Sequence, residues 1–261
     1  MTVQAWAATA ERAVRAAGAE LLRLQGGPLE VRLKDARVDV TSSADAAAQR
    51  AVNAVLAAEY PDHLVIGEEE GGEPDPDRPV WYVDPLDGTR NYLNGVPYFC
   101  TSVAVTVRGE VLAGAVYDPS RDELYSTVRG GGAWCDGRPL QVSPVDDVAR
   151  ALVVTQAQSA DPQLIREFAD LMALLMGVSG GVRFPGAPAL VLAHIAAGRY
   201  TAYVERVMDP WDVAAGRLLV EEAGGRFTDF AGHPVGMALA DVVASNGLVH
   251  DALLKALQEG T

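Results

Sequence analysis

The N-terminal third of the chain carries helical and extended hydrophobic patterns in turn. Apolar residues recur every three or four positions over 4–24, which predicts an amphipathic helix that ends at Gly26-Gly27-Pro28. A second helical pattern follows Asp45 and ends at Pro61. Apolar extended stretches predict strands at 29–33, 64–66 and 79–83.

The middle of the chain is predicted to be antiparallel sheet. Alternating apolar and polar residues at 102–107 and 111–117 flank the turn Arg108-Gly109, which is typical of a hairpin. Further sheet with tight turns is predicted over 124–128 and 133–142. The glycines at 130–132 between them have no following helix or lysine, so they indicate a turn rather than a phosphate-binding loop.

After 143–147 the pattern changes to alternating strands and helices, which indicates an α/β layer. We therefore expect two parts: an α+β part over 1–145 with an antiparallel sheet, and an α/β part over 146–261. Strands are predicted at 151–155, 181–184, 200–205, 226–229 and 242–245, and helices at 162–176, 188–198, 211–223 and 249–258.

Composition narrows the possible functions. The chain has 261 residues and a net charge of −14, which disfavours binding to nucleic acid or to an anionic membrane. No stretch reaches the roughly 18 apolar residues that span a bilayer, and no signal peptide is evident over 1–10, so a cytoplasmic enzyme is expected. Cys100 and Cys135 are too few for a disulfide framework and lack metal-site spacing.

The strand at 79–83 leads into Asp84-Pro85-Leu86-Asp87-Gly88-Thr89, where two carboxylates stand three residues apart. Pro85 forces Asp84 into extended backbone and predicts a turn directly after it. Gly88 permits close approach of a ligand to the backbone. An Asp-Gly pair alone would suit an ordinary surface turn, but this longer string offers acids for a hard cation and amides for a phosphate.

Two further acids are expected near this turn. Glu68 ends the strand at 64–66, beside the strand that leads to Asp84, although a run of acids is also compatible with a solvated surface. Asp212 lies in the first turn of a predicted helix, where it could simply interact favourably with the helix dipole. Acids that converge in this way would repel one another unless cations neutralise them.

Three strings together resemble the inositol monophosphatase family of Mg²⁺-dependent, lithium-sensitive phosphatases. They are Ile66-Gly67-Glu68-Glu69, the Asp84–Thr89 string and Trp211-Asp212-Val213-Ala214-Ala215-Gly216, in family order. The resemblance runs from about Lys34 to the C-terminus. It implies the layered αβαβα sandwich that the family shares with fructose-1,6-bisphosphatase.

The resemblance also implies a metal site that binds Mg²⁺, with Mn²⁺ as a possible substitute. Oxygen ligands without Cys or His suit both ions. The implied ligands are Glu68, Asp84, the carbonyl of Leu86, Asp87 and Asp212. Lys34 matches the basic residue of the family's mobile metal-site loop, although its charged surroundings would also suit plain solvation.

Catalytic and substrate roles are implied in the same way. Thr89 and Asp45, together with Glu68, would orient and deprotonate the attacking water, although Asp45 could also be only a helix cap. Glu205, seven residues before Asp212, matches a position that contacts inositol hydroxyls, and could otherwise be a surface acid at a strand end. The implied substrate-binding residues are Asp87, Gly88, Thr89, Ala187 and Glu205.

The resemblance implies hydrolysis of myo-inositol 1-phosphate or a similar sugar or polyol phosphate by water that the metal activates. Fructose 1,6-bisphosphate, histidinol phosphate and 3′-phosphoadenosine nucleotides are alternatives on the same scaffold, and a non-catalytic regulator is a different class. Gly186-Ala187-Pro188 departs from the family's usual Gly-Ser/Thr-Ala, which leaves the substrate open. The expected partner is a small phosphate monoester, with neither nucleic acid nor membrane, and a homodimer is expected.

Overall fold

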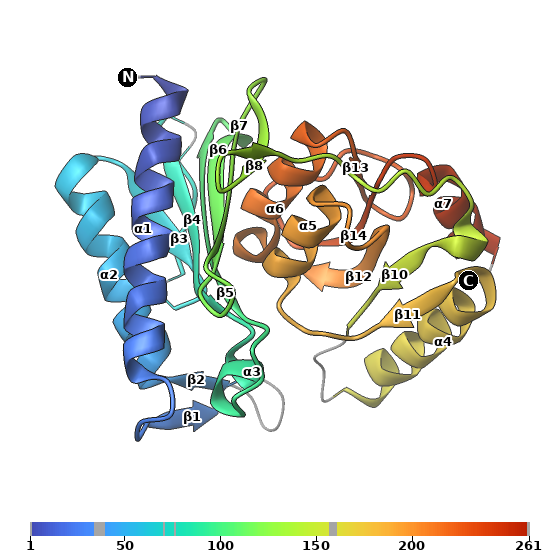
Figure 1. Cartoon of the computed structure of the whole chain (residues 1–261), viewed down its shortest axis with the longest axis horizontal. Helices are drawn as coiled ribbons and strands as arrows, with labels where there is room; N and C mark the ends of the chain where they lie inside the picture. The colour runs from blue at the N-terminus through green and yellow to red at the C-terminus, as the bar shows by residue number, and fades with distance from the viewer. Residues whose placement is uncertain (1, 34–39, 70, 76, 157–160, 260–261) are drawn as a thin grey trace.

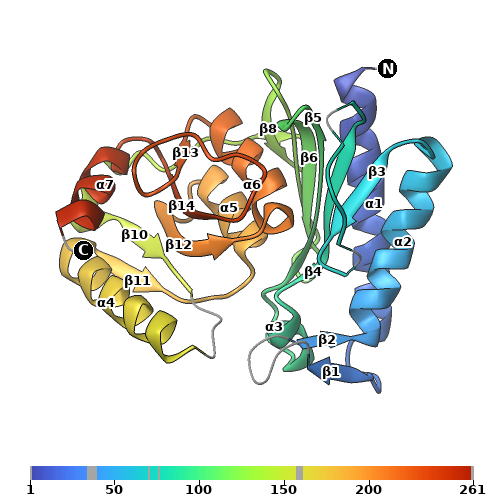
Figure 2. The ribbon, with the colours of Figure 1, turned by 180° about the vertical axis from the view of Figure 1, so that it is seen from behind.

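Five layers of secondary structure, alternately helical and extended, build the protein in the computed structural model (Figures 1 and 2). The structure describes residues 2–33, 40–69, 71–75, 77–156 and 161–259. Two helices cover a seven-stranded sheet, two more lie between this sheet and a five-stranded one, and a third pair covers the far face. The αβαβα sandwich expected from the sequence is thus confirmed.

The first helix layer consists of α1 (Val3–Leu24) and α2 (Ser43–Glu59), which pack side by side on the seven-stranded sheet. Small side chains such as Ala10, Ala13 and Ala17 are buried along α1. They let the helix lie close to the sheet and to α2, so this layer needs few large residues.

The seven-stranded sheet has the order β3-β4-β5-β6-β7-β8-β9. Only the β3–β4 pair is parallel, and β4 is buried at every one of its positions because helices cover both faces. The strands are β3 (Leu64–Gly67), β4 (Val80–Asp87), β5 (Cys100–Val107), β6 (Glu110–Asp118), β7 (Glu123–Val128), β8 (Gly132–Cys135) and β9 (Arg138–Pro139).

The five-stranded sheet has the order β11-β10-β12-β14-β13, with β10 parallel to both of its neighbours. Helices α4 (Pro162–Val178) and α7 (His250–Glu259) cover its outer face. The strands are β10 (Leu152–Val154), β11 (Gly181–Arg183), β12 (Ala202–Met208), β13 (Arg226–Thr228) and β14 (Ala240–Ser245). Smaller elements are the ribbon of β1 (Val31–Leu33) and β2 (Val40–Ser42), the short α3 (Thr89–Leu93) and the 3₁₀ turn η1 (Val148–Arg150).

The middle layer, α5 (Pro188–Ala196) and α6 (Pro210–Glu222), contacts both sheets. All residues of α5 are buried, which explains why its sequence is apolar all round. The two helices cross closely at Gly216, where an added Cβ would lie 2.5 Å from the Cβ of Leu192. The largest hydrophobic core therefore joins residues from both halves of the chain.

Several predicted strand boundaries are wrong, among them the end of the strand expected at 200–205, which continues as β12 to Met208. The strand expected at 79–83 continues as β4 to Asp87, and the stretch 133–142 is broken into β8 and β9 by a turn at Asp136-Gly137. The change from one sheet to the other does fall between β9 and η1, but the core is shared, so the division at 145 stays a prediction. Across the described residues, no helix has both the length and the apolarity needed to cross a membrane.

Candidate active site

A cavity of about 640 Å³ brings together residues from both halves of the chain. Most of the residues singled out in the sequence line it, namely Glu68, Asp84, Leu86, Asp87, Gly88, Thr89, Ala187, Glu205 and Asp212. Asp45 lies behind this lining and reaches it through Thr89. Lys34 lies outside the described residues.

An irregularity in β4 orients its two acids. Asp84 pairs with Ser102 and Asp87 with Cys100 of β5, so two residues of β4 stand opposite Thr101 alone. Such a bulge shifts the alternation of side chains by one position. Asp84 and Asp87, three residues apart, consequently face the same side of the sheet, which regular alternation would prevent. The hydroxyl of Thr101 donates to the Pro85 carbonyl over 3.1 Å and holds the bulge.

The other two acids approach from neighbouring elements. Glu68 follows β3, the parallel neighbour of β4, and its backbone N–H donates to the Val83 carbonyl over 3.4 Å. Asp212 lies in the first turn of α6, the helix packed against β4 and β5. Because β3 pairs with β4, Glu68 lies beside the bulge. Asp212 reaches the bulge because α6 begins next to it.

Burial makes these carboxylates resist ionisation. Loss of hydration, followed by repulsion from the neighbouring acids, holds the pKa values of Asp84 and Asp212 well above their usual range. Loss of hydration also raises the pKa of Asp87 to about 7, although hydrogen bonds to its charged form oppose the shift. Acids so placed would lose their protons to water when a cation binds and neutralises their charge.

Asp87 also caps a helix from the other half of the chain. Its carboxylate accepts hydrogen bonds from the backbone N–H groups of Ala189, over 2.8 Å, and Leu190, over 3.4 Å. These donors lie in the first turn of α5, where residue Ala187 has no side chain able to cap. The buried thiol of Cys100 donates to the same oxygen of Asp87 over 3.4 Å. The second carboxylate oxygen remains for the cavity.

Thr89 and Asp45 form a hydrogen-bonded pair behind the cavity. The hydroxyl of Thr89 lies 2.9 Å from one carboxylate oxygen of Asp45 and 3.0 Å from the Leu86 carbonyl. The other oxygen of Asp45 accepts from the backbone N–H of Ser42 over 2.7 Å and completes the capping box of α2. Asp45 is therefore part of the capping box of α2 and also a hydrogen-bond partner of Thr89, and its role toward water stays a prediction.

The far wall of the cavity holds a buried glutamate. Glu205 accepts hydrogen bonds from the backbone N–H groups of Gln156, over 2.6 Å, and Arg206, over 2.9 Å. Burial nevertheless raises its pKa to about 8. Gln156 lines the cavity too, and its buried side-chain oxygen has no partner among the described residues. No pattern in the sequence indicated Gln156, because only the pairing of β10 with β12 brings it beside Glu205.

The family model of the inositol monophosphatase family matches residues 2–261 of this chain. The chain belongs to the inositol monophosphatase family. It is 38% identical over 254 residues to a Nus factor SuhB from Pseudomonas aeruginosa, covering 95% of this chain and 93% of the relative. The solved inositol monophosphatase of Anabaena superposes with a TM-score of 0.89 at 34% identity, covering 99% of this chain and 97% of that one.

Another solved family structure is described as an IMPase/NADP phosphatase complexed with Mg²⁺ and phosphate. It superposes with a TM-score of 0.79 at 25% identity, covering 90% of this chain and 88% of that one. The acids of the present cavity fit such an ion: they are buried, mutually repelling oxygen donors, without Cys or His among them. Cys100 does not alter this chemistry, because burial raises the pKa of its thiol and it remains a hydrogen-bond donor.

Gly88 is required for a reason that the sequence did not reveal. Its φ of +90° is left-handed, and an added Cβ would lie 3.0 Å from both the Ala187 Cβ and the Tyr98 carbonyl oxygen. The missing side chain thus makes room for neighbouring protein, and the close approach of a ligand expected from the sequence stays a prediction. Ala187 also has a positive φ, of 54°, directly before Pro188. These two residues meet across the cavity floor in this member of the family.

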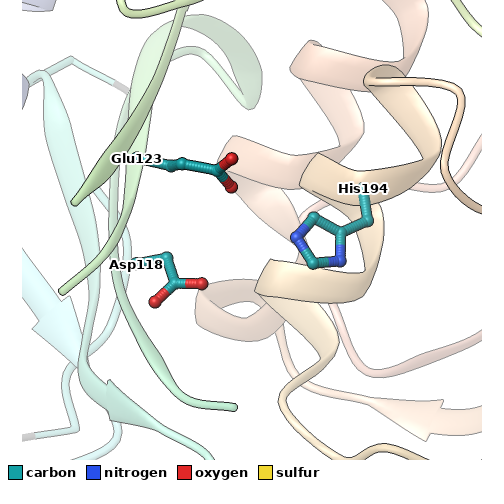
Figure 3. A group of neighbouring side chains, drawn as sticks. All are labelled: Asp118, Glu123 and His194. Atoms are coloured by element: carbon teal, nitrogen blue, oxygen red, sulfur yellow. The ribbon is translucent and has the colours of Figure 1, made fainter. Parts of the chain in front are cut away.

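A second group of acids lies away from the cavity (Figure 3). Ligand atoms of Asp118, Glu123 and His194 lie within 4.8 Å of one another. Arg121 pairs with Asp118 and Arg199 with Glu123, each over 2.6 Å. Arginines thus already neutralise both carboxylates, and none of the three lines the cavity. Sequence spacing did not reveal this group, which joins the β6–β7 hairpin to α5 as an ion-pair network.

Proposed function

We propose that this protein is a Mg²⁺-dependent phosphomonoesterase that hydrolyses myo-inositol 1-phosphate or a similar sugar or polyol phosphate. The observation that carries the proposal is the meeting of Glu68, Asp84, Asp87 and Asp212 in one cavity with the Thr89–Asp45 pair at its edge. A phosphate ester is an anion, and this acidic cavity accepts one only together with cations.

The proposed metal ligands are the four carboxylates and the carbonyl of Leu86. Mg²⁺, or Mn²⁺ in its place, supplies positive charge that attracts the phosphate and stabilises the charge developing in the transition state. Magnesium in the Mg²⁺ and phosphate complex named above supports this assignment. Because the carboxylate pKa values are raised, the acids lose protons as the ions bind, and ion affinity increases with pH.

The protein residues position the reactants. Asp45 accepts the Thr89 hydroxyl hydrogen, so a lone pair on that oxygen is free to accept from the attacking water. Glu68 lies at the cavity surface, where it receives the proton that water loses. Gly88 and Thr89 bind the phosphate oxygens through their backbone N–H groups. Glu205, protonated or charged, contacts hydroxyls on the alcohol side.

The test is release of inorganic phosphate from four substrates, each with Mg²⁺ and with a chelator. These are myo-inositol 1-phosphate, fructose 1,6-bisphosphate, histidinol phosphate and 3′-phosphoadenosine 5′-phosphate. We expect Mg²⁺-dependent turnover, fastest with the inositol ester. Turnover of only the nucleotide would reject the substrate assignment, and absence of Mg²⁺-dependent turnover of all four would reject the phosphomonoesterase itself.

A further inference from the structure

The cavity extends beyond the carboxylates along a wall of apolar side chains. Leu164 and Phe168 come from α4, Phe184 follows β11 and Val207 belongs to β12. Leu164, Phe184 and Val207 are 40%, 51% and 51% exposed. Large apolar side chains left open to water beside a polar site mark a place where an apolar group binds. We refer to these four residues as the apolar wall.

Two aromatic rings form the centre of the apolar wall. The rings of Phe168 and Phe184 lie 5.3 Å apart, centroid to centroid, with 63° between their planes. This edge-to-face arrangement is favourable and fixes both rings. Both residues line the cavity. A third ring can pack on them with the same offset or edge-to-face geometry.

Val207, a member of the apolar wall, has a strained backbone conformation. Its φ is 58°, in the left-handed region that a β-branched residue rarely adopts. The register of β12 against β14 shifts between Glu205 and Met208, and Asp241 accepts a hydrogen bond from the Val207 N–H over 3.1 Å. A strained residue held in this way at the rim of a cavity is a sign of function. The bulge leaves Glu205 buried in the cavity and Val207 open at its rim.

The cavity lining also includes polar groups, Glu205 and the side-chain oxygen of Gln156, which has no partner among the described residues. Hydroxyl groups of a substrate find partners there, whereas hydroxyls against the apolar wall would lose their hydration without replacement. A ligand that fills the cavity therefore carries both polar groups and a flat apolar group.

We propose that the apolar wall is a subsite for an aromatic group carried on the alcohol side of the phosphate ester. This inference rests on the proposed phosphomonoesterase function and specifies its substrate class: an ester whose alcohol bears an aromatic ring is preferred over an equally reactive ester without one. The preference enters through binding, so it lowers KM more than it raises kcat.

The test compares 2-phenylethyl phosphate with 2-hydroxyethyl phosphate, which both release primary alcohols and so match in leaving-group chemistry. We expect kcat/KM to be about tenfold higher for the phenyl ester, mainly through KM. Phe184→Ala is expected to abolish most of this ratio. Val207→Gly is expected to lower it without lowering the thermal midpoint of unfolding, because glycine accepts the left-handed backbone.

The matched control is Ile165→Ala. Ile165 neighbours Leu164 on α4 and is 42% exposed, but it does not line the cavity. We expect it to leave the ratio unchanged. Equal kcat/KM values for the two esters in the wild-type protein, or an equal loss of the ratio in Ile165→Ala and Phe184→Ala, would overturn the subsite.

A binding measurement separates failure of the subsite from failure of the proposed function. Calorimetry with 2-phenylethylphosphonate and Mg²⁺ needs no hydrolysis. A Kd about tenfold weaker in Phe184→Ala than in the wild type supports the subsite even if neither ester is hydrolysed, which would reject only the phosphomonoesterase. An unchanged Kd, or no binding by the wild type, rejects the subsite even if 2-hydroxyethyl phosphate is turned over.

Discussion

The Thr89 hydroxyl lies 2.9 Å from the carboxylate of Asp45, which precedes it by 44 residues and stands in the first turn of α2. The same hydroxyl is 3.0 Å from the Leu86 carbonyl, and its single hydrogen serves one acceptor at a time. Donation to Asp45 leaves the oxygen of Thr89 as an acceptor facing the cavity. In the proposed mechanism, the first turn of α2 therefore contributes to the orientation of water at a site that it does not line.

Replacement of Thr89 tests this arrangement. We expect Thr89→Ala to lower kcat for phosphate release by about 10²–10⁴-fold, the range for loss of a positioned acid–base group. Thr89→Ser keeps the hydroxyl and should stay within about tenfold of the wild type. Circular dichroism and the thermal midpoint serve as fold controls. A Thr89→Ala protein with wild-type kcat would show that the hydroxyl has no part in the reaction.

Mg²⁺ should stabilise the protein through the acids of the cavity. An ion present at 100 times its Kd adds about 2.7 kcal/mol to the free energy of unfolding. For a chain of this size, that raises the thermal midpoint by roughly 5–10 °C. Asp212→Asn should lose most of this shift together with hydrolysis, as measured by scanning calorimetry and phosphate release.

Without metal, Asp212→Asn is expected to have the opposite effect on stability relative to the wild type. Asn in place of Asp212 removes a buried acid whose ionisation is unfavourable beside the neighbouring acids, so the chelated variant should be at least as stable as the chelated wild type. A marked loss of stability in the chelated variant would indicate that Asp212 holds the fold through contacts rather than binding an ion.

Asp87 should prove to be both a ligand and a cap. Asp87→Asn and Asp87→Ala both remove the charge, and both are expected to abolish Mg²⁺-dependent hydrolysis. Only Asn retains an oxygen that can accept from the Ala189 N–H. The Ala variant should therefore unfold more easily than the Asn variant by about 0.5–2 kcal/mol, the usual value of a helix cap. Equal denaturation midpoints for the two would refute the cap.

Glu205 should make stability depend on pH. Its pKa in the folded protein is about 8, above the ordinary 4.5, so folding favours its protonated form. This contribution is complete below pH 4.5, declines as pH rises to 8 and is absent above that. Relative to Glu205→Gln, the wild type should lose up to about 1.4 kcal/mol per pH unit within this window. Urea titrations at pH 5, 6.5 and 8.5 measure the difference, and a constant difference would contradict the raised pKa.

Residue patterns predicted the elements well where local periodicity decides them. The apolar stripe of α1 and the alternation in β5 and β6 each depend on nearby residues, and the structure confirms all three. The predicted end of β4 was wrong because pairing with β5 determines the bulge at Pro85 and Leu86. A local sequence pattern carries no information about that pairing.

The same limit applies to the candidate site. The strings that contain Asp84, Asp87 and Asp212 identified its acids through resemblance to a family. The hydrogen bonds from α5 to Asp87 and the position of Gln156 beside Glu205 arise from contacts between residues 49 or more positions apart. The apolar wall was likewise not predicted, because Phe168 and Phe184 meet only after α4 packs beside β11.

The middle helices α5 and α6 determine when the site is completed during folding. Asp84 and Asp87 belong to the first sheet, whereas Asp212 and the capped turn of α5 arrive with helices enclosed between both sheets. A nascent chain that has completed only its first sheet holds four of the five proposed ligands and lacks Asp212. High-affinity ion uptake should therefore begin only when the last layers close, and it can serve as a reporter of finished assembly.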